Sequence, residues 1–421
     1  MPDPAAPAVT TPAPARHRWP VALFVTGIVA LAFNLRAAVT SLPPLFPELS
    51  ARLGLSSAEL ALLAATPVLC FAVFSGVAAP LSRRFGEERV LLAALVLLAG
   101  GLAMRGLAPQ WLLFPGTVAA GAAIALMNVL LPSLVKRRQA ARAGWLLGIY
   151  LLSLSAGAIL GSLIAVPVYR ASGHSVPLAV GMWALPAVLA MVAWLPQARY
   201  RTLPAERDPA GRDAAGGPAA GQPGGTRLVR VSRHLLAWQV MLFMGLQSLT
   251  YYATLSWLPI LFRDRGASAA GAGGLLALMN LGNAVTALFI PVLAHRTRDQ
   301  RVLVAATVAA SMAGLAGVWF APSSLAAAWT LLLGLGQGAS LGLALYFTMA
   351  RTGDPVTAAS LSAFSQGGGY LVSAIGPLLT GLLHSVTGSW TVPIAALLVI
   401  FCGQFAAGWG AARHRFLPSR R

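Results

Sequence analysis

Residues 81–91 read Leu-Ser-Arg-Arg-Phe-Gly-Glu-Glu-Arg-Val-Leu, and residues 293–303 read Leu-Ala-His-Arg-Thr-Arg-Asp-Gln-Arg-Val-Leu. Five positions coincide at a constant offset of 212 residues. A second match has an offset of 220 residues and pairs Tyr150, Leu151, Ser153 and Gly161 with Tyr370, Leu371, Ser373 and Gly381. Both matches join segments half a chain apart in the same direction, so the sequence predicts a parallel repeat of two halves.

The composition indicates that lipid is the main solvent of this chain. Hydrophobic residues make up 57% of the 421 residues and charged residues only 10%, whereas a soluble domain has about 25% charged residues. Apolar runs long enough to cross a bilayer recur along the chain, separated by short polar or Pro/Gly breaks. We predict an all-α membrane protein with twelve transmembrane helices in two six-helix, pseudo-symmetric bundles. The predicted spans are 19–42, 57–81, 90–107, 111–135, 143–168, 176–196, 235–261, 269–294, 302–320, 324–350, 361–385 and 390–411.

The positive charge is concentrated on one side of the predicted membrane. A net charge of +19 would suggest a nucleic-acid partner for a soluble protein, but 24 of the 30 Lys and Arg residues fall on the side of the N-terminus. Because cytoplasmic loops are rich in Lys and Arg, we expect a multi-pass protein of the bacterial inner membrane with both termini in the cytoplasm. We expect no nucleic-acid partner. The predicted divisions are a disordered tail at 1–18, bundles at 19–196 and 235–411, a flexible cytoplasmic linker at 197–234 and a cytoplasmic tail at 412–421.

Several short strings carry a family resemblance. They are Asn34-Leu-Arg36 with Thr40, Thr66-Pro67-Val68, residues 131–138 (LPSLVKRR), Trp257-Leu-Pro259, and Gly266-Ala-Ser268 leading to residues 275–279 (LLALM). Together they resemble the cyanate permease and 2-nitroimidazole transporter family of the major facilitator superfamily. The resemblance implies transport of small anionic or nitro-aromatic solutes. The chain departs from the family at Ala37, where Pro is common. It also has Ser82 in the region where the superfamily's signature has an acidic residue.

Arg36 is the main candidate for a substrate contact. It lies about 15 residues into the first predicted helix, and a guanidinium exposed to lipid at mid-depth costs at least ~2.5 kcal/mol. Such a residue persists when it faces a polar cavity, where its planar fork can bind an anion. The open alternative is that Arg36 extends to the outer membrane surface, as we expect for Arg105 at the end of the third helix.

Other polar groups inside the predicted spans recur at helical spacings on several helices. Each alone could be a bond between helices, but as a set they are candidates to line a shared cavity. The predicted substrate-binding residues are Arg36, Asn34, Thr40, Asn128, Tyr150, Gln247, Tyr251, Tyr252, Asn280, Asn283, Gln366 and Tyr370. Closely spaced glycines such as Gly157 and Gly161, and Gly334, Gly338 and Gly342, are expected to let helices approach one another.

The acidic residues narrow the classes of function. All 11 Asp and Glu residues fall in tails, loops or the ends of spans, so no carboxylate is available at mid-membrane for cation/proton antiport. No cluster suggests an enzyme, a catalytic residue, a metal site or a cofactor. We therefore predict a monomeric secondary transporter in the lipid bilayer that moves a small anion. The alternative is efflux of nitroimidazole-like or other small aromatic compounds, favoured weakly by Gly148, Gly157 and Gly161, which partly match a drug-export motif but are followed by Ser162 instead of Pro.

Overall fold

The structure is a computed structural model, and it describes residues 21–107, 110–139, 142–199, 231–297 and 299–417. The first half contains α1 (Val21–Thr40), α3 (Ser57–Phe85), α4 (Glu87–Arg105), α5 (Leu113–Arg138), α6 (Ala143–Ala171) and a sixth span made of α7 (Val176–Gly181) and α8 (Ala184–Trp194). The second half contains α10 (Leu235–Asp264), α11 (Ala269–Arg296), α12 (Arg301–Phe320), α13 (Ala326–Ala350), α14 (Pro355–Thr387) and α15 (Thr391–Ala411).

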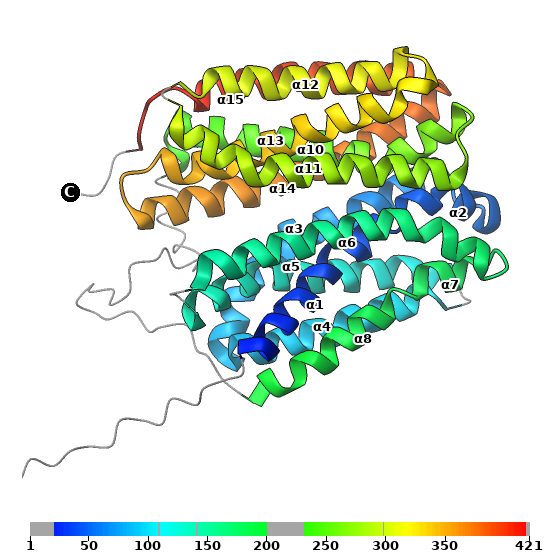
Figure 1. Ribbon diagram of the computed structural model, residues 1–421, viewed down its shortest axis with the longest axis horizontal. Coiled ribbons are helices and arrows are strands. Elements are labelled where there is room, and N and C mark those ends of the chain that lie inside the picture. The colour runs from blue at the N-terminus through cyan, green and yellow to red at the C-terminus, as the bar shows by residue number, and fades with distance from the viewer. Residues whose placement is uncertain (1–20, 108–109, 140–141, 200–230, 298, 418–421) are drawn as a thin grey trace, which may run out of the picture.

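These helices form two bundles, one from each half of the chain (Figure 1). Helices suit a membrane because every backbone group within the span is hydrogen-bonded inside the same segment. Within the described residues, ten helical segments are long and apolar enough to cross a membrane. The other two spans are α4, which begins with Glu87 and Glu88, and α10, which carries many polar and aromatic side chains. The predicted two-bundle fold of twelve spans is confirmed.

Some predicted boundaries differ from the observed ones for identifiable reasons. The sixth span, predicted as continuous, breaks at residues 182–183, where Pro186 lacks the N–H that would reach the carbonyl of Met182. α14 begins six residues before the predicted span, because Asp354 caps it by accepting hydrogen bonds from Val356 N and Thr357 N. The predicted tail at 1–18 and residues 200–230 of the predicted linker lie outside the described residues.

The internal repeat is visible in the packing of each bundle. α1 packs against α6 in the first half, and its counterpart α10 packs against α14 in the second. The equivalent glycines Gly161 and Gly381 both sit at these contacts, Gly161 against Ala37 and Thr40, and Gly381 against Trp257. The repeat found in the sequence therefore corresponds to a repeated helix–helix contact.

The two halves meet mainly through α3 with α14 and α6 with α11. At the end of the molecule that carries α2 (Phe46–Leu53), which we call the sealed end, Arg263 of α10 pairs with Glu48 at 2.7 Å. Beside it the rings of Phe46 and Trp257 lie 6.3 Å apart. These contacts close the sealed end between the halves.

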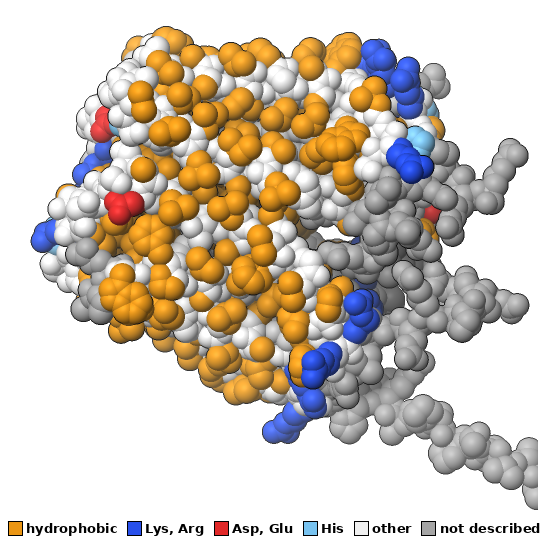
Figure 2. All heavy atoms as spheres, turned by 180° about the vertical axis from the view of Figure 1, so that it is seen from behind, with side chains coloured by type: hydrophobic (Ala, Val, Ile, Leu, Met, Phe, Trp, Pro, Cys, Tyr) orange, Lys and Arg blue, Asp and Glu red, His pale blue; other side chains and the backbone are white. Residues whose placement is uncertain are grey.

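The opposite end, which we call the basic end, carries the α3–α4 and α11–α12 turns and residues 412–417. Figure 2 shows Lys and Arg side chains gathered there, an apolar middle band, and a hollow between the halves. The predicted asymmetry of charge is thus a property of the folded surface.

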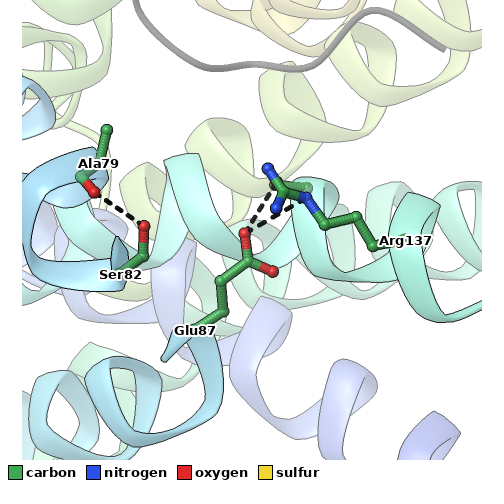
Figure 3. Close-up of polar contacts among 5 residues, drawn as sticks. Ala79, Ser82, Glu87 and Arg137 are labelled. Atoms are coloured by element: carbon green, nitrogen blue, oxygen red, sulfur yellow. Dashed lines mark hydrogen bonds and ion pairs between the residues drawn. The ribbon is translucent and has the colours of Figure 1, made fainter. Parts of the chain in front are cut away.

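At the basic end the first half is held together by internal charged contacts. Glu87 lies 3.7 Å from Arg137 and accepts a hydrogen bond from Ser133, while Glu88 pairs with Arg138 at 2.7 Å. Figure 3 shows Ser82 turned to the carbonyl of Ala79 instead of to this pair. The charged contacts therefore join α4 to α5 within the first half.

We expect Gly157→Ala to lower the thermal unfolding temperature, because a Cβ there would clash with the backbone carbonyl of Phe33 on α1. Overpacking of this kind costs about 1–3 kcal/mol. Gly148→Ala on the same helix is the matched control, since a Cβ there meets nothing within 4 Å and alanine is the better helix former. Thermal unfolding in detergent measures both variants, and equal loss of stability in the two would contradict this packing.

Candidate functional site

Arg36 lies on α1 near the contact between the two halves. Its side chain is half-buried, and its Cζ atom lies 5.7 Å from the ring centroid of Tyr251, which belongs to α10 in the other half. Within the described part of the chain, the guanidinium makes no hydrogen bond and no ion pair. A cation over an aromatic face gains about 0.5–2 kcal/mol, which is less than a full complement of hydrogen bonds provides. The group is therefore available to a ligand.

Four tyrosines surround Arg36. Tyr150 of α6, Tyr251 and Tyr252 of α10 and Tyr370 of α14 all lie close enough to interact with it electrostatically. Tyr150 and Tyr370 are equivalent in the repeat, so the two halves supply a matched pair of hydroxyls. All four tyrosines were predicted candidates, and the structure places them together with Arg36.

Two neighbouring residues support these tyrosines. The Tyr150 hydroxyl donates to Asn128 Oδ1 at 3.4 Å, which places the predicted Asn128 behind Tyr150. The ring of Phe71 on α3 lies edge-on to Tyr370 with the centroids 5.7 Å apart. Phe71 was not predicted, because a single aromatic residue in an apolar helix carries no signal of its own.

A hydrogen-bonded chain leads from Tyr251 across the interface. The Tyr251 hydroxyl donates to Asn280 Oδ1 at 3.0 Å, and Asn280 Nδ2 donates to Ser162 Oγ at 3.2 Å. Asn280 belongs to α11 in the second half and Ser162 to α6 in the first. Ser162 was not predicted as a site residue, because it was noted only where a drug-export motif has Pro. The feature that could have identified it is a hydroxyl directly after Gly161, a glycine predicted to let helices approach.

The remaining candidates on the second half bond within that half. Gln247 donates to Ser248 Oγ at 2.6 Å, and Gln366 donates to Ser362 Oγ at 2.9 Å. Asn283 is half-buried, and its backbone carbonyl packs against Gly338. Among the described residues, no hydrogen bond connects Gln247, Gln366 or Asn283 to Arg36 or its tyrosines.

Asn34 and Thr40 are held away from the Arg36 guanidinium. Asn34 Nδ2 donates to the carbonyls of Ala30 at 2.8 Å and Pro186 at 3.1 Å, so it ties α1 to α8. Thr40 is fully buried, donates to the Arg36 carbonyl at 3.0 Å, and packs against Gly161. Both side chains serve helix contacts in this state.

The expectation that Arg105 extends to the outer membrane surface is wrong. Its side chain is only 4% exposed, and its Nη1 donates to the carbonyl of Ala38 at 3.1 Å. Ala38 lies in the last turn of α1, where carbonyl groups have no helical partner and the helix dipole favours a cation. Burial at this helix end, which sequence position alone does not reveal, replaces the predicted exposure.

The chain belongs to the major facilitator superfamily, whose family model matches residues 22–377. It is 38% identical over 381 residues to the 2-nitroimidazole transporter of Escherichia coli (strain K12), covering 90% of this chain and 92% of the relative. It is 32% identical over 376 residues to the cyanate transport protein CynX of the same strain, covering 89% and 93%. This chain is thus a multi-pass membrane transporter and not an enzyme, and the predicted family is confirmed.

A solved structure shows the same fold at low sequence identity. A bacterial homolog of the human lysosomal transporter Spinster, in an inward-facing and unoccupied conformation, aligns with a TM-score of 0.76 and 15% identity. The alignment covers 95% of this chain and 98% of that one.

We expect Arg36→Cys, in a background with Cys70→Ala and Cys402→Ala, to react with a small membrane-impermeant thiol reagent. Arg36 is half-buried and partly accessible, whereas Asn34 is 2% exposed. Asn34→Cys is therefore the control and should stay unlabelled. Mass spectrometry after labelling of right-side-out and inside-out vesicles measures the reaction from each side. Labelling of Asn34→Cys at the rate of Arg36→Cys would contradict this placement of the two side chains.

Proposed function

We propose that this protein is a secondary active transporter that moves a small anionic solute, cyanate-like or a small organic anion, across the bacterial inner membrane by alternating access. The observation that carries the proposal is the state of Arg36, a half-buried guanidinium with no hydrogen bond or ion pair among the described residues. Such a charge is costly away from water unless an anion joins it. A transported anion supplies that partner and is itself desolvated by the aromatic surroundings.

The proposed mechanism is a rocking of the first bundle against the second. The contacts of Glu48 with Arg263 and of Phe46 with Trp257 close the sealed end. The internal ties of Arg137 and Arg138 keep the first half rigid at the basic end. With the basic end in the cytoplasm, as the positive-inside rule favours, this state would admit substrate from the cytoplasm. We propose that the protein acts as a monomer, since one chain supplies both sides of the site.

Efflux of a nitroimidazole-like or other small aromatic compound is the second candidate. The ring of tyrosines around Arg36 favours it, because aromatic faces stack on flat rings. The relative named as a 2-nitroimidazole transporter also supports it, just as the relative named as a cyanate transport protein supports the anion. The two candidates differ in whether the solute must be charged.

We expect Arg36→Ala to weaken anion binding at least about tenfold, because hydrogen bonds to charged groups contribute about 1.5–3 kcal/mol. The measurement is counterflow of labelled cyanate, a short carboxylate and 2-nitroimidazole in proteoliposomes. Arg52→Ala, which removes an exposed arginine of α2, is the control and should transport normally.

The outcomes separate the two candidates. Counterflow of anions by the wild type that is lost in Arg36→Ala would support the anion carrier. Transport of 2-nitroimidazole alone, unchanged in Arg36→Ala, would overturn it and favour aromatic efflux.

A further inference from the structure

We propose that Ser162 is a positioning residue that couples occupancy of the Arg36 site to the contact between the two halves. Ser162 completes the chain of hydrogen bonds from Tyr251 through Asn280, and this chain holds α6 against α11 when the site is empty. A bound anion draws the Tyr251 hydroxyl away and loosens the contact. The inference rests on the proposed function, since the anion at Arg36 is what changes the chain.

The direction of every hydrogen bond in the chain is fixed. The Tyr251 hydroxyl donates to Asn280 Oδ1, Asn280 Nδ2 donates to Ser162 Oγ, and the Ser162 hydroxyl donates to the Ala158 carbonyl at 2.9 Å within its own helix. Asn280 Nδ2 also donates to Leu276 O at 3.1 Å. Each acceptor is thus matched to one donor, and the chain ends in the α6 backbone.

The surroundings of the chain exclude water. Ser162 is 0% exposed, Asn280 3% and Tyr251 7%. Gly273 of α11 packs so closely that a Cβ there would lie 2.8 Å from the Ser162 carbonyl oxygen. In such a dry contact a broken hydrogen bond leaves a polar group unsatisfied, which costs more than the same loss at the surface. The Asn280–Ser162 hydrogen bond therefore shifts the equilibrium between the open and the closed interface toward the closed one.

The Tyr251 hydroxyl has Asn280 Oδ1 as its acceptor, and the positively charged Arg36 guanidinium lies over the ring of the same tyrosine. An anion bound to Arg36 neutralises that charge and offers a stronger acceptor than an amide oxygen. When the hydroxyl turns to the anion, Asn280 Oδ1 loses its donor and the amide is free to leave Ser162.

We expect Ser162→Ala to open the sealed end in the empty protein. Spin labels at Arg52→Cys and Thr387→Cys, both exposed and on opposite halves, report the separation of the halves in a background with Cys70→Ala and Cys402→Ala. The population with the longer distance should rise about two- to tenfold, the effect of one hydrogen bond. Ser153→Ala is the matched control, because Ser153 lies on the same helix, is nearly buried, and bonds only to its own helix at Ile149 O.

Titration with cyanate separates this coupling from a merely structural role. Cyanate should shift the distance population in the wild type and in Ser153→Ala, and should shift it much less in Ser162→Ala. Asn280→Ala breaks the same bond from the other side, so adding Ser162→Ala to it should change nothing further. This second variant keeps the test open if Ser162→Ala folds poorly.

The results distinguish failure of the coupling from failure of the proposed function. An equal cyanate shift in Ser162→Ala and wild type, or an unchanged empty state in Ser162→Ala, would overturn the coupling. A wild type that ignores cyanate and short carboxylates, with Ser162→Ala still opening the sealed end, would overturn the anion substrate and the coupling to it, and leave Ser162 as a contact between the halves.

Discussion

Arg36 places a permanent positive charge where the two bundles meet, and the groups around it partly offset the desolvation cost of that charge. No carboxylate among the described residues pairs with it, so tyrosine rings and hydroxyls form its surroundings. Different helix contacts position the tyrosines. The position of Tyr150 depends on the close packing of α6 on α1, which Gly157 and Gly161 allow. Tyr370 occupies the equivalent position in the repeat. The packing of the helices thus places aromatic side chains from both halves around the Arg36 guanidinium.

The two ends of the molecule are held by different kinds of contact. At the sealed end the ties run between the halves, as in the pair of Glu48 and Arg263. At the basic end they run within a half, and Ser82, which lacks the acid of the superfamily signature, bonds only to its own helix. This difference between the two ends suits the proposed rocking of one bundle against the other.

The fold was largely predictable from the sequence, because membrane spans require long apolar runs. The repeat was predictable because residues such as Arg84 and Arg296 match between the two halves. The four tyrosines could also be named as candidates from the sequence, because a polar group inside an apolar span needs a hydrogen-bond partner, and their role in binding stays a prediction. The orientation of Asn34 was not predictable, because its Nδ2 donates to the Pro186 carbonyl on α8, which only the folded packing supplies. Thr40 donates to the Arg36 carbonyl in its own helix, and its burial against Gly161 of α6 also comes from the packing. Burial of Arg105 escaped prediction for the same reason, since its partner is a backbone carbonyl with no residue signature.

Other arginines that are buried or half-buried differ from Arg36 in their partners. Several use carbonyl groups at the ends of helices, where the helix dipole is negative. Arg351 donates to Ala411 O at 2.8 Å and Ala412 O at 2.9 Å at the end of α15, and Arg265 donates to Val318 O and Ala321 O at the end of α12. Arg105 does the same at α1, and Arg138 and Arg263 have carboxylates. In this chain of 30 basic and 11 acidic residues, several arginines thus have backbone carbonyls in place of acids, although Arg105 Nε and Nη2 have no hydrogen-bond partner among the described residues. Arg36 lies one turn before the end of α1, and its guanidinium makes no hydrogen bond among the described residues, so the proposed anion would supply its partner.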